Sequence, residues 1–223
     1  MSRIIFDIET VGVDFETLDE KSREYFLKYA ETPEAQDEAK ASLSFYPQTG
    51  QIVAIGILNP DTNKGAVYYQ SSDGSQEKIQ EDEVQYVPSS EKEILKTFWD
   101  VIRYYDQFIT FNGRTFDCPY IMIRSGILKI KPSKNLMPNR YYDQHIDLLD
   151  RLSFFGAVRR KMSLHVWCQA FGIASPKDQG ITGDDVGRLF KEGRSLDIAR
   201  YCFGDLRATK ELFDYWDKYI NIK

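Results

Sequence analysis

The sequence predicts an α/β fold in which helices flank a mixed central β-sheet. Residues 4–6 open a buried strand, and residues 51–58 form a nearly continuous apolar run that is typical of a second one. Between residues 91 and 152, helical patterns alternate with short β-type runs, and helical patterns fill the remainder. With 223 residues and 42% hydrophobic side chains, we expect a single domain over residues 1–223.

The first strand, RIIFDIET at residues 3–10, leads into a charged, amphipathic insertion at about residues 14–45. We expect this insertion to be helical, because Thr32 can cap a helix whose first residue is Pro33. The run 51–58 and the return strand AVYYQ are separated by the turn NPDTNKG. This order predicts a hairpin.

The stretch 71–89 is polar and acidic, so we expect a loop or a mobile edge there. Ser90 and Glu93 have the spacing of a capping box, which predicts that a helix with an apolar stripe begins next. The run 107–111 is a short β-type segment, and the Asn-Gly pair after it indicates a turn.

The second half of the chain predicts mainly helices. FDCPYIMIRSG is expected to be a helix that stops at Gly126, and residues 145–152 begin as a strand and continue as a helix. Ser163 is expected to cap the helix LHVWCQAFG. Another helix is expected from about 184 to 192, and Ser195 starts a long final helix.

Charge is distributed unevenly along a chain whose net charge is −5. Residues 1–100 hold 20 acidic and 9 basic side chains, whereas residues 124–161 hold 9 basic and 3 acidic ones. The basic segment is either a solvated surface or a local positive patch for phosphates, and both interpretations remain open.

The composition favours a cytoplasmic protein. No apolar run is long enough to span a bilayer, and Asp7 and Glu9 interrupt the N-terminal apolar run too early for a signal region. The three cysteines lie far apart without a C-x-x-C pair, which predicts free thiols in a reducing compartment and argues against a zinc site.

Two carboxylates, Asp7 and Glu9, interrupt the first strand at alternate positions. Side chains at i and i+2 of a strand point to one face, so these two project together while Ile8 points into the core. Like charges placed so close repel each other unless a cation lies between them. Because hard divalent cations prefer oxygen ligands, the pair favours a metal site over a solvated edge strand.

Other carboxylates stand at the ends or in the interior of later elements. Asp117 follows a strand and a turn, where an N-cap is the alternative interpretation. Asp205 lies inside the final helix, where Asp is unfavourable, and Tyr201 shares its helix face. Four acids beside a phenol suit a two-metal hydrolase that acts on phosphodiesters.

Other chemistries have little support. The sequence contains no G-x-S-x-G, phosphate-binding G-x-x-x-x-G-K-[ST], G-x-G-x-x-G or H-E-x-x-H pattern. His165 lies in an apolar helix and is expected to be a packed residue. His145 and Asp147 are weaker candidates, since the segment HIDLL could place Asp147 near the same edge as the acids.

The ordered acids resemble the 3′–5′ exonucleases of the RNase H-like superfamily that are called DEDD. The motif D-x-E matches Asp7–Glu9, N-x-x-x-F-D matches Asn112–Asp117, and Y-x-x-x-D matches Tyr201–Asp205. The tyrosine marks the DEDDy branch. The motifs are most similar to the exonuclease domain of family B DNA polymerases and to its stand-alone bacterial relatives. The resemblance covers nearly the whole chain outside 14–45 and 71–89, and it implies an RNase H-like fold.

The resemblance also implies a 3′–5′ exonuclease with two divalent cations, Mg²⁺ or Mn²⁺. The implied metal ligands are Asp7, Glu9, Asp117 and Asp205. Tyr201 would orient the attacking water and assist its deprotonation, although a free phenol is a poor base at neutral pH.

Three further residues are implied to contact the substrate. Thr10 would meet the 3′ end through its backbone, and Asn112 and Phe116 would hold or stack on the terminal nucleotides. Phe116 could equally be a core residue. The implied partner is nucleic acid with a single-stranded 3′ end, DNA in preference to RNA, and no membrane.

The acidic insertion at 14–45 could cover the groove or bind a protein partner. Two alternatives to the exonuclease remain. One is a structure-selective endonuclease on the same scaffold, and the other is a non-catalytic nucleic-acid-binding or protein-binding module. The second is disfavoured because all five catalytic positions carry suitable residues.

Overall fold

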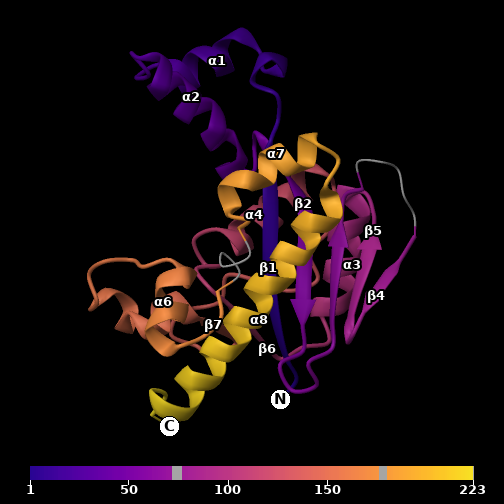
Figure 1. Cartoon of the computed structure of the whole chain (residues 1–223), viewed down its shortest axis with the longest axis vertical. Coiled ribbons are helices and arrows are strands. Elements are labelled where there is room, and N and C mark those ends of the chain that lie inside the picture. Colours follow the sequence, from indigo (N-terminus) through magenta and orange to yellow (C-terminus); the bar gives the residue numbers. More distant parts are fainter. Residues whose placement is uncertain (72–76, 176–179, 223) are drawn as a thin grey trace.

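The computed structural model describes residues 1–71, 77–175 and 180–222, and its centre is a mixed seven-stranded sheet with helices on both faces (Figure 1). The strand order is β4-β5-β3-β2-β1-β6-β7. The strands are β1 (Arg3–Gly12), β2 (Gly50–Leu58), β3 (Gly65–Tyr69), β4 (Ile79–Glu81), β5 (Val84–Pro88), β6 (Gln107–Thr110) and β7 (His145–Asp147). β1 runs antiparallel to β2 and parallel to β6, so the expected mixed α/β fold is confirmed.

The helices divide between the two faces of the sheet. The α-helices are α1 (Glu20–Leu27), α2 (Pro33–Ala41), α3 (Glu91–Ile102), α4 (Asp117–Ile127), α5 (Leu148–Leu152), α6 (Leu164–Phe171), α7 (Val186–Lys191) and α8 (Ser195–Tyr219). Helices α3 and α4 pack on one face, and α8 crosses the other face over β1 and β2 (Figure 1).

The alternation of side chains along β1 follows these two faces. Phe6 and Ile8 belong to the core under α3 and α4, whereas Ile5 packs with Leu206 of α8 on the opposite face. Because Asp7 lies one residue from both Phe6 and Ile8, its side chain is on the α8 face. The central strand therefore supplies apolar side chains to both layers and acids to one of them.

The insertion after β1 is helical, as expected. Thr32 accepts a hydrogen bond from the N–H of Ala35 at 3.2 Å, and Pro33 is the first residue of α2. Neither α1 nor α2 contains a buried residue, and Figure 1 shows the two helices standing off the body of the protein. The buried side chains of Phe15 and Leu43 anchor the two ends of this insertion.

The sequence predicts a loop or a mobile edge over 71–89. The loop is wrong for the second half, since β4 and β5 lie there, whereas an edge is present because β4 is the outermost strand of the sheet; residues 72–76 fall outside the described residues. In β5, Val84 and Tyr86 are buried and Gln85 is exposed, so the strand has the usual alternation. The many acidic residues around it conceal this pattern in the sequence. Parallel pairing with β3 stabilises the strand.

The predicted stop of α4 at Gly126 is also wrong, because the helix continues through Ile127 and is capped at Leu128. Ser163 does stand at the N-cap of α6, but its side chain makes no capping hydrogen bond. In contrast, the Ser90 side chain accepts from the N–H of Glu93 at 3.3 Å, as predicted for α3.

A buried ion pair ties α3 to α4. Both guanidinium nitrogens Nε and Nη2 of Arg124 donate to the Glu91 carboxylate, at 2.8 and 2.7 Å, and the two side chains are each 11% exposed. Glu91 also accepts from the N–H of Ile52 at 2.9 Å, so the pair joins both helices to β2. Within residues 1–71, 77–175 and 180–222, no helix is long and apolar enough to cross a membrane.

Candidate active site

Strand β1 carries Asp7 and Glu9 to the face of the sheet that α8 covers. Oxygen atoms of both carboxylates and the Sγ of Cys202 all lie within 4.8 Å of one another. The pairing of β1 with β2 shifts directly after Glu9, where Val53 is the extra residue of a bulge. Such bulges redirect side chains near the end of a strand.

Asp117 approaches β1 from α4, which packs on the other face of the sheet. It is the first residue of α4, its carboxylate accepts from the N–H of Ile8 at 3.1 Å, and only 4% of it is exposed. Pairing between β1 and β6 ends at Ile5 and Ile109, so this N–H has no strand partner beyond that point. The capping interpretation of Asp117 is therefore wrong: the N-cap is Phe116, and Asp117 fixes the start of α4 against β1.

Helix α8 brings Tyr201 and Asp205 to the same place because it packs unusually close to the sheet. Gly56 of β2 lies opposite Asp7, and a Cβ there would lie 2.6 Å from Leu206 Cδ1 and 2.9 Å from Cys202 Sγ. The absence of a side chain at Gly56 thus permits the close approach of α8. The thiol of Cys202 lies 3.8 Å from both the carbonyl and the carboxylate of Asp7.

The four acids perturb one another strongly. Burial raises the pKa of Asp7 well above its ordinary value, and the charges of Asp117, Asp205 and Glu9 raise it further. The same two causes raise the pKa of Glu9, while burial raises the pKa of Asp117 to about 7. Each charge therefore destabilises the others unless a cation compensates them.

The phenol of Tyr201 retains its proton in this setting. Burial, followed by the charge of Asp205, raises the Tyr201 pKa well above its ordinary value, and the two side chains share a hydrogen bond. A phenol with a raised pKa is a donor and not a base. The neighbouring Cys202 thiol also stays protonated, since burial raises its pKa, and a thiol is a poor ligand for a hard cation.

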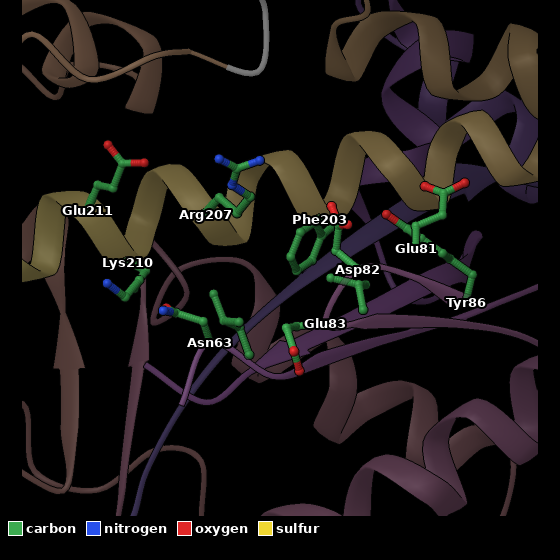
Figure 2. A pocket seen from close by; sticks show the side chains of 11 residues that line it. Asn63, Glu81, Asp82, Glu83, Tyr86, Phe203, Arg207, Lys210 and Glu211 are labelled. Atoms are coloured by element: carbon green, nitrogen blue, oxygen red, sulfur yellow. The ribbon is translucent and has the colours of Figure 1, made fainter. Parts of the chain in front are cut away.

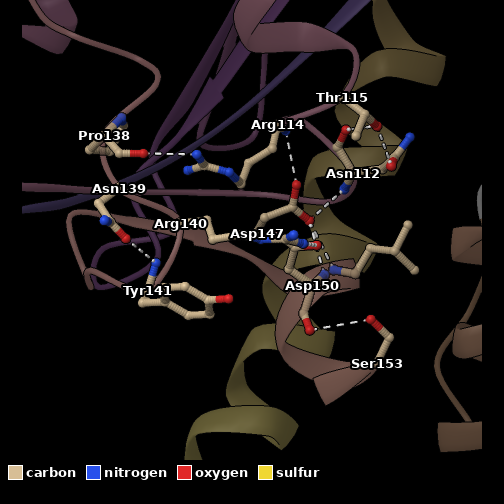
Figure 3. Close-up of polar contacts among 11 residues, drawn as sticks. Asn112, Arg114, Thr115, Pro138, Asn139, Arg140, Tyr141, Asp147, Asp150 and Ser153 are labelled. Atoms are coloured by element: carbon tan, nitrogen blue, oxygen red, sulfur yellow. Dashed lines mark hydrogen bonds and ion pairs between the residues drawn. The ribbon is translucent and has the colours of Figure 1, made fainter. Parts of the chain in front are cut away.

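Asp147 organises the turn that precedes Asp117 (Figure 3). Its carboxylate accepts from the N–H groups of Asn112 at 3.0 Å and Arg114 at 2.9 Å. It also accepts from the N–H groups of Leu149 and Asp150 at the start of α5. The Asn112 backbone has a positive φ of 62°, a conformation that Asn tolerates better than most residues. Asp147 is thus a structural acid of this turn.

Two of the three predicted substrate contacts, Thr10 and Phe116, lie close to the insertion. The Thr10 hydroxyl donates to the carbonyl of Ser44 at 2.8 Å. Phe116 is half-buried against the α3–α4 core, and its ring lies 6.4 Å from the exposed ring of Phe45 at the end of the insertion. The Asn112 amide oxygen accepts from the Thr115 hydroxyl at 2.6 Å.

A small cavity of about 170 Å³ adjoins the acids. Its lining residues are Asp7, Phe111, Leu164, His165, Ser175, Tyr201 and Asp205. The expectation that His165 is a packed residue is wrong, because its half-buried ring lines this cavity. The sequence missed His165 because its neighbours in α6 are apolar. Phe111 and Ser175 were also missed, since neither belongs to a motif.

His145 is a buried residue with a structural role. It is 1% exposed, its Nε2 is hydrogen-bonded to the Thr110 hydroxyl at 2.8 Å, and its ring lies 4.4 Å from that of Phe108. Burial lowers the His145 pKa to about 3. The neutral ring therefore belongs to the packing of β6 and β7.

A larger cavity of about 530 Å³ lies on the opposite face of α8, near β4 and β5 (Figure 2). Phe203 and Arg207 of α8 contribute to it, about half a helical turn away from Tyr201 and Asp205. Its lining mixes acidic side chains, such as Glu83, with basic ones. Cavity size alone therefore does not identify the acidic site.

Much of the basic segment 124–161 is paired within the protein. Arg124 belongs to the buried pair described above, Arg140 pairs with Asp150, and Arg151 pairs with Asp143. Lys129, Lys131 and the residues 159–161 remain as exposed basic side chains. The choice between a solvated face and a phosphate patch therefore stays open for these residues.

Comparison with known proteins gives a family match and matches to curated DNA polymerases. The family described as "Predicted 3'-5' exonuclease related to the exonuclease domain of PolB" matches residues 47–214. A DNA polymerase of Desulfurococcus sp. (strain Tok) is 31% identical over 144 residues, which is 56% of this chain and 18% of the polymerase. A DNA polymerase of Pyrococcus horikoshii is 30% identical over 143 residues, which is 56% of this chain and 11% of the polymerase.

Among solved structures, the family B DNA polymerase of Pyrobaculum calidifontis superposes with a TM-score of 0.61 over 97% of this chain and 24% of the polymerase, at 15% identity. At that identity the likeness shows the fold alone. The chain thus matches less than a fifth of the length of the curated polymerases and about a quarter of the solved one.

The sheet, its flanking helices and the superposition define an α/β domain with an RNase H-like fold. The chain belongs to the family of predicted 3′–5′ exonucleases related to the exonuclease domain of PolB. The family match includes Asp117, Tyr201 and Asp205 but begins after β1, so the positions of Asp7 and Glu9 rest on the geometry above.

Proposed function

We propose that the protein is a metal-dependent 3′–5′ exonuclease that hydrolyses phosphodiester bonds at the 3′ end of single-stranded nucleic acid. One observation carries the proposal: β1, α4 and α8 bring four carboxylates together around Asp7, and the other three raise its pKa. Family membership supports the reaction class. We treat residues 1–223 as one exonuclease-like domain with an insertion at 14–45.

The donor set fits divalent cations. Asp7, Glu9, Asp117 and Asp205 offer oxygen ligands, and their mutual repulsion makes a cation favourable between them. When bound, two ions such as Mg²⁺ or Mn²⁺ would neutralise this charge, polarise a phosphodiester and activate water. We assign Asp7 the central position because its carboxylate lies within 4.8 Å of Glu9 and because the charges of all three other acids raise its pKa.

The remaining groups hold the substrate and the water. We assign Tyr201 the role of orienting the attacking water through its phenol oxygen while its proton is bonded to Asp205, in place of the base role that the resemblance suggested. The bond from Ile8 to Asp117 holds the start of α4 at the site. The network around Asp147 does the same for the turn at Asn112.

The rings of Phe116 and Phe45 offer stacking surfaces for a single strand beside the acids. Thr10 is available through its backbone, since its hydroxyl is bonded to Ser44. We assign DNA in preference to RNA as the substrate. The acidic insertion, with exposed Tyr25 and Tyr29, is the surface that we assign to a protein partner.

The test is digestion of a 5′-labelled single-stranded oligonucleotide with Mn²⁺ or with EDTA. We expect stepwise shortening from a free 3′ end, no shortening with EDTA, and none when the 3′ end is blocked. Asp7→Ala should abolish turnover, whereas Asp100→Asn, an exposed acid of α3, should not change it. Cleavage of blocked or circular substrate would indicate an endonuclease, and the absence of any turnover would favour a binding module.

A further inference from the structure

The small cavity beside the acids is also lined by a group that no nuclease motif includes. Asp7, Tyr201 and Asp205 form one side of the cavity, while Leu164, His165 and Ser175 line it from α6 and the segment that follows. Helix α6 packs against α8, which carries Tyr201 and Asp205 (Figure 1). An imidazole therefore lines the same cavity as the proposed reacting groups.

The orientation of the His165 ring is fixed through Ser175. The Nδ1 atom of His165 lies 2.8 Å from the Ser175 hydroxyl, and Ser175 is 4% exposed. Cys168, one turn along α6, is fully buried and holds the helix in place. When the hydroxyl donates to Nδ1, the Nε2 atom on the other side of the ring carries the proton and is a donor.

An Nε2–H donor of His165 would suit an anionic substrate. The cavity is dominated by negative charge, and the substrate of the proposed reaction is itself an anion. An imidazole N–H attracts a phosphate oxygen and does not compete with carboxylates for a hard cation, which prefers oxygen ligands. The contrast with His145 supports this, because the Nε2 atom of His145 is already bonded to Thr110 in the core.

Building on the proposed function, we propose that His165 is a phosphate-contacting residue of this site, positioned by Ser175. Its Nε2–H donates to the phosphate of the 3′-terminal nucleotide. The ligand class is a nucleoside 5′-monophosphate unit, either in the chain end or as the released product. Ser175 is a positioning residue, because it acts only through the ring that it orients.

The chain contains two histidines, so imidazole NMR spectra can test this contact directly. Thymidine 5′-monophosphate is titrated into ¹⁵N-labelled protein in the presence of Ca²⁺. We expect the Nε2 resonance of His165 to shift with saturation and that of His145 to stay in place. An unmoved His165 resonance at saturating nucleotide would overturn the proposal.

Variants measure how much the His165 contact contributes to nucleotide affinity. His165→Ala should weaken thymidine 5′-monophosphate binding about tenfold, the value of one hydrogen bond to a charged group. His165→Gln retains an N–H donor and should recover part of the affinity. Gln169→Ala, at an exposed position of the same helix, is the matched control and should bind like the wild type.

Two further measurements distinguish failure of the His165 proposal from failure of the proposed function. Mn²⁺ affinity should be unchanged in His165→Ala, and a loss equal to the loss of nucleotide affinity would make His165 a metal ligand and overturn the proposal. If wild-type protein shortens the oligonucleotide and His165→Ala equals it in rate and nucleotide affinity, only the His165 inference fails. If the wild type itself shows no turnover, the proposed function fails.

Discussion

Replacing Asp117 with Asn should make the metal-free protein more stable at alkaline pH, although it removes a proposed metal ligand. Burial raises the pKa of Asp117 from 3.8 to about 7. A raised carboxyl pKa means that the folded state holds the proton more tightly than the unfolded state. The free energy of unfolding therefore falls as the pH rises from about 4 to about 7, and the full penalty is present above pH 7.

The size of the effect follows from the shift. About three pKa units, at roughly 1.4 kcal/mol each, correspond to a penalty of about 4 kcal/mol above pH 7. Asn carries no charge, and its amide oxygen can still accept the N–H of Ile8, which Asp117 now accepts at 3.1 Å. The variant should thus avoid the penalty and keep the bond.

Urea unfolding in EDTA at pH 4 and pH 8 measures this gain. At pH 4 Asp117→Asn should resemble the wild type, because the native carboxyl is protonated there. At pH 8 it should exceed the wild type by up to about 4 kcal/mol. Mn²⁺ should then stabilise the wild type more than the variant. An equal difference at both pH values would refute the reasoning, and the exposed control Asp100→Asn should show no such dependence.

Three more predictions concern the packing and the phenol. Gly56→Ala should displace α8 by most of 1 Å, since the new Cβ would lie 2.6 Å from Leu206. This displacement should lower kcat/KM by up to about 10²-fold. The control Gly126→Ala, with open space around its Cβ, should leave kcat/KM unchanged. Arg124→Met should reduce the free energy of unfolding by roughly 3–5 kcal/mol, against under about 0.5 kcal/mol for the exposed Arg103→Met. Tyr201→Phe should lower kcat about 10²-fold without changing Mn²⁺ affinity; loss of metal binding would contradict the assigned role.

Local sequence patterns correctly predict those elements whose ends depend on a few neighbouring residues. Thr32 and Pro33 mark the start of α2, and Ser90 marks that of α3, because caps depend on side chains three or four residues apart. The acidic residues around β5 concealed its alternation, since a strand at this position is stabilised by pairing with β3, which sequence spacing does not reveal.

In the candidate site, too, local patterns predict some residues and long-range packing determines the others. Asp7 and Glu9 are two residues apart on one strand, so period-2 geometry alone places them together. The bond between Ile8 and Asp117, and the place of His165 in the same cavity as Tyr201, depend on how distant elements pack. No local pattern contains that information, which is why the sequence predicts only a packed residue at His165.

We expect the buried acids around Asp7 to form a divalent metal site. Calorimetric titration of Mn²⁺ into the wild type and Asp7→Asn, in two buffers of different ionisation enthalpy, measures this binding. Because the pKa of Asp117 is about 7 and those of Asp7 and Glu9 are raised, Mn²⁺ binding near pH 6.5 should release protons. We expect two ions per wild-type chain, with proton release, and greatly weakened binding to Asp7→Asn. Equal affinity in both proteins, or binding without proton release, would contradict the claim.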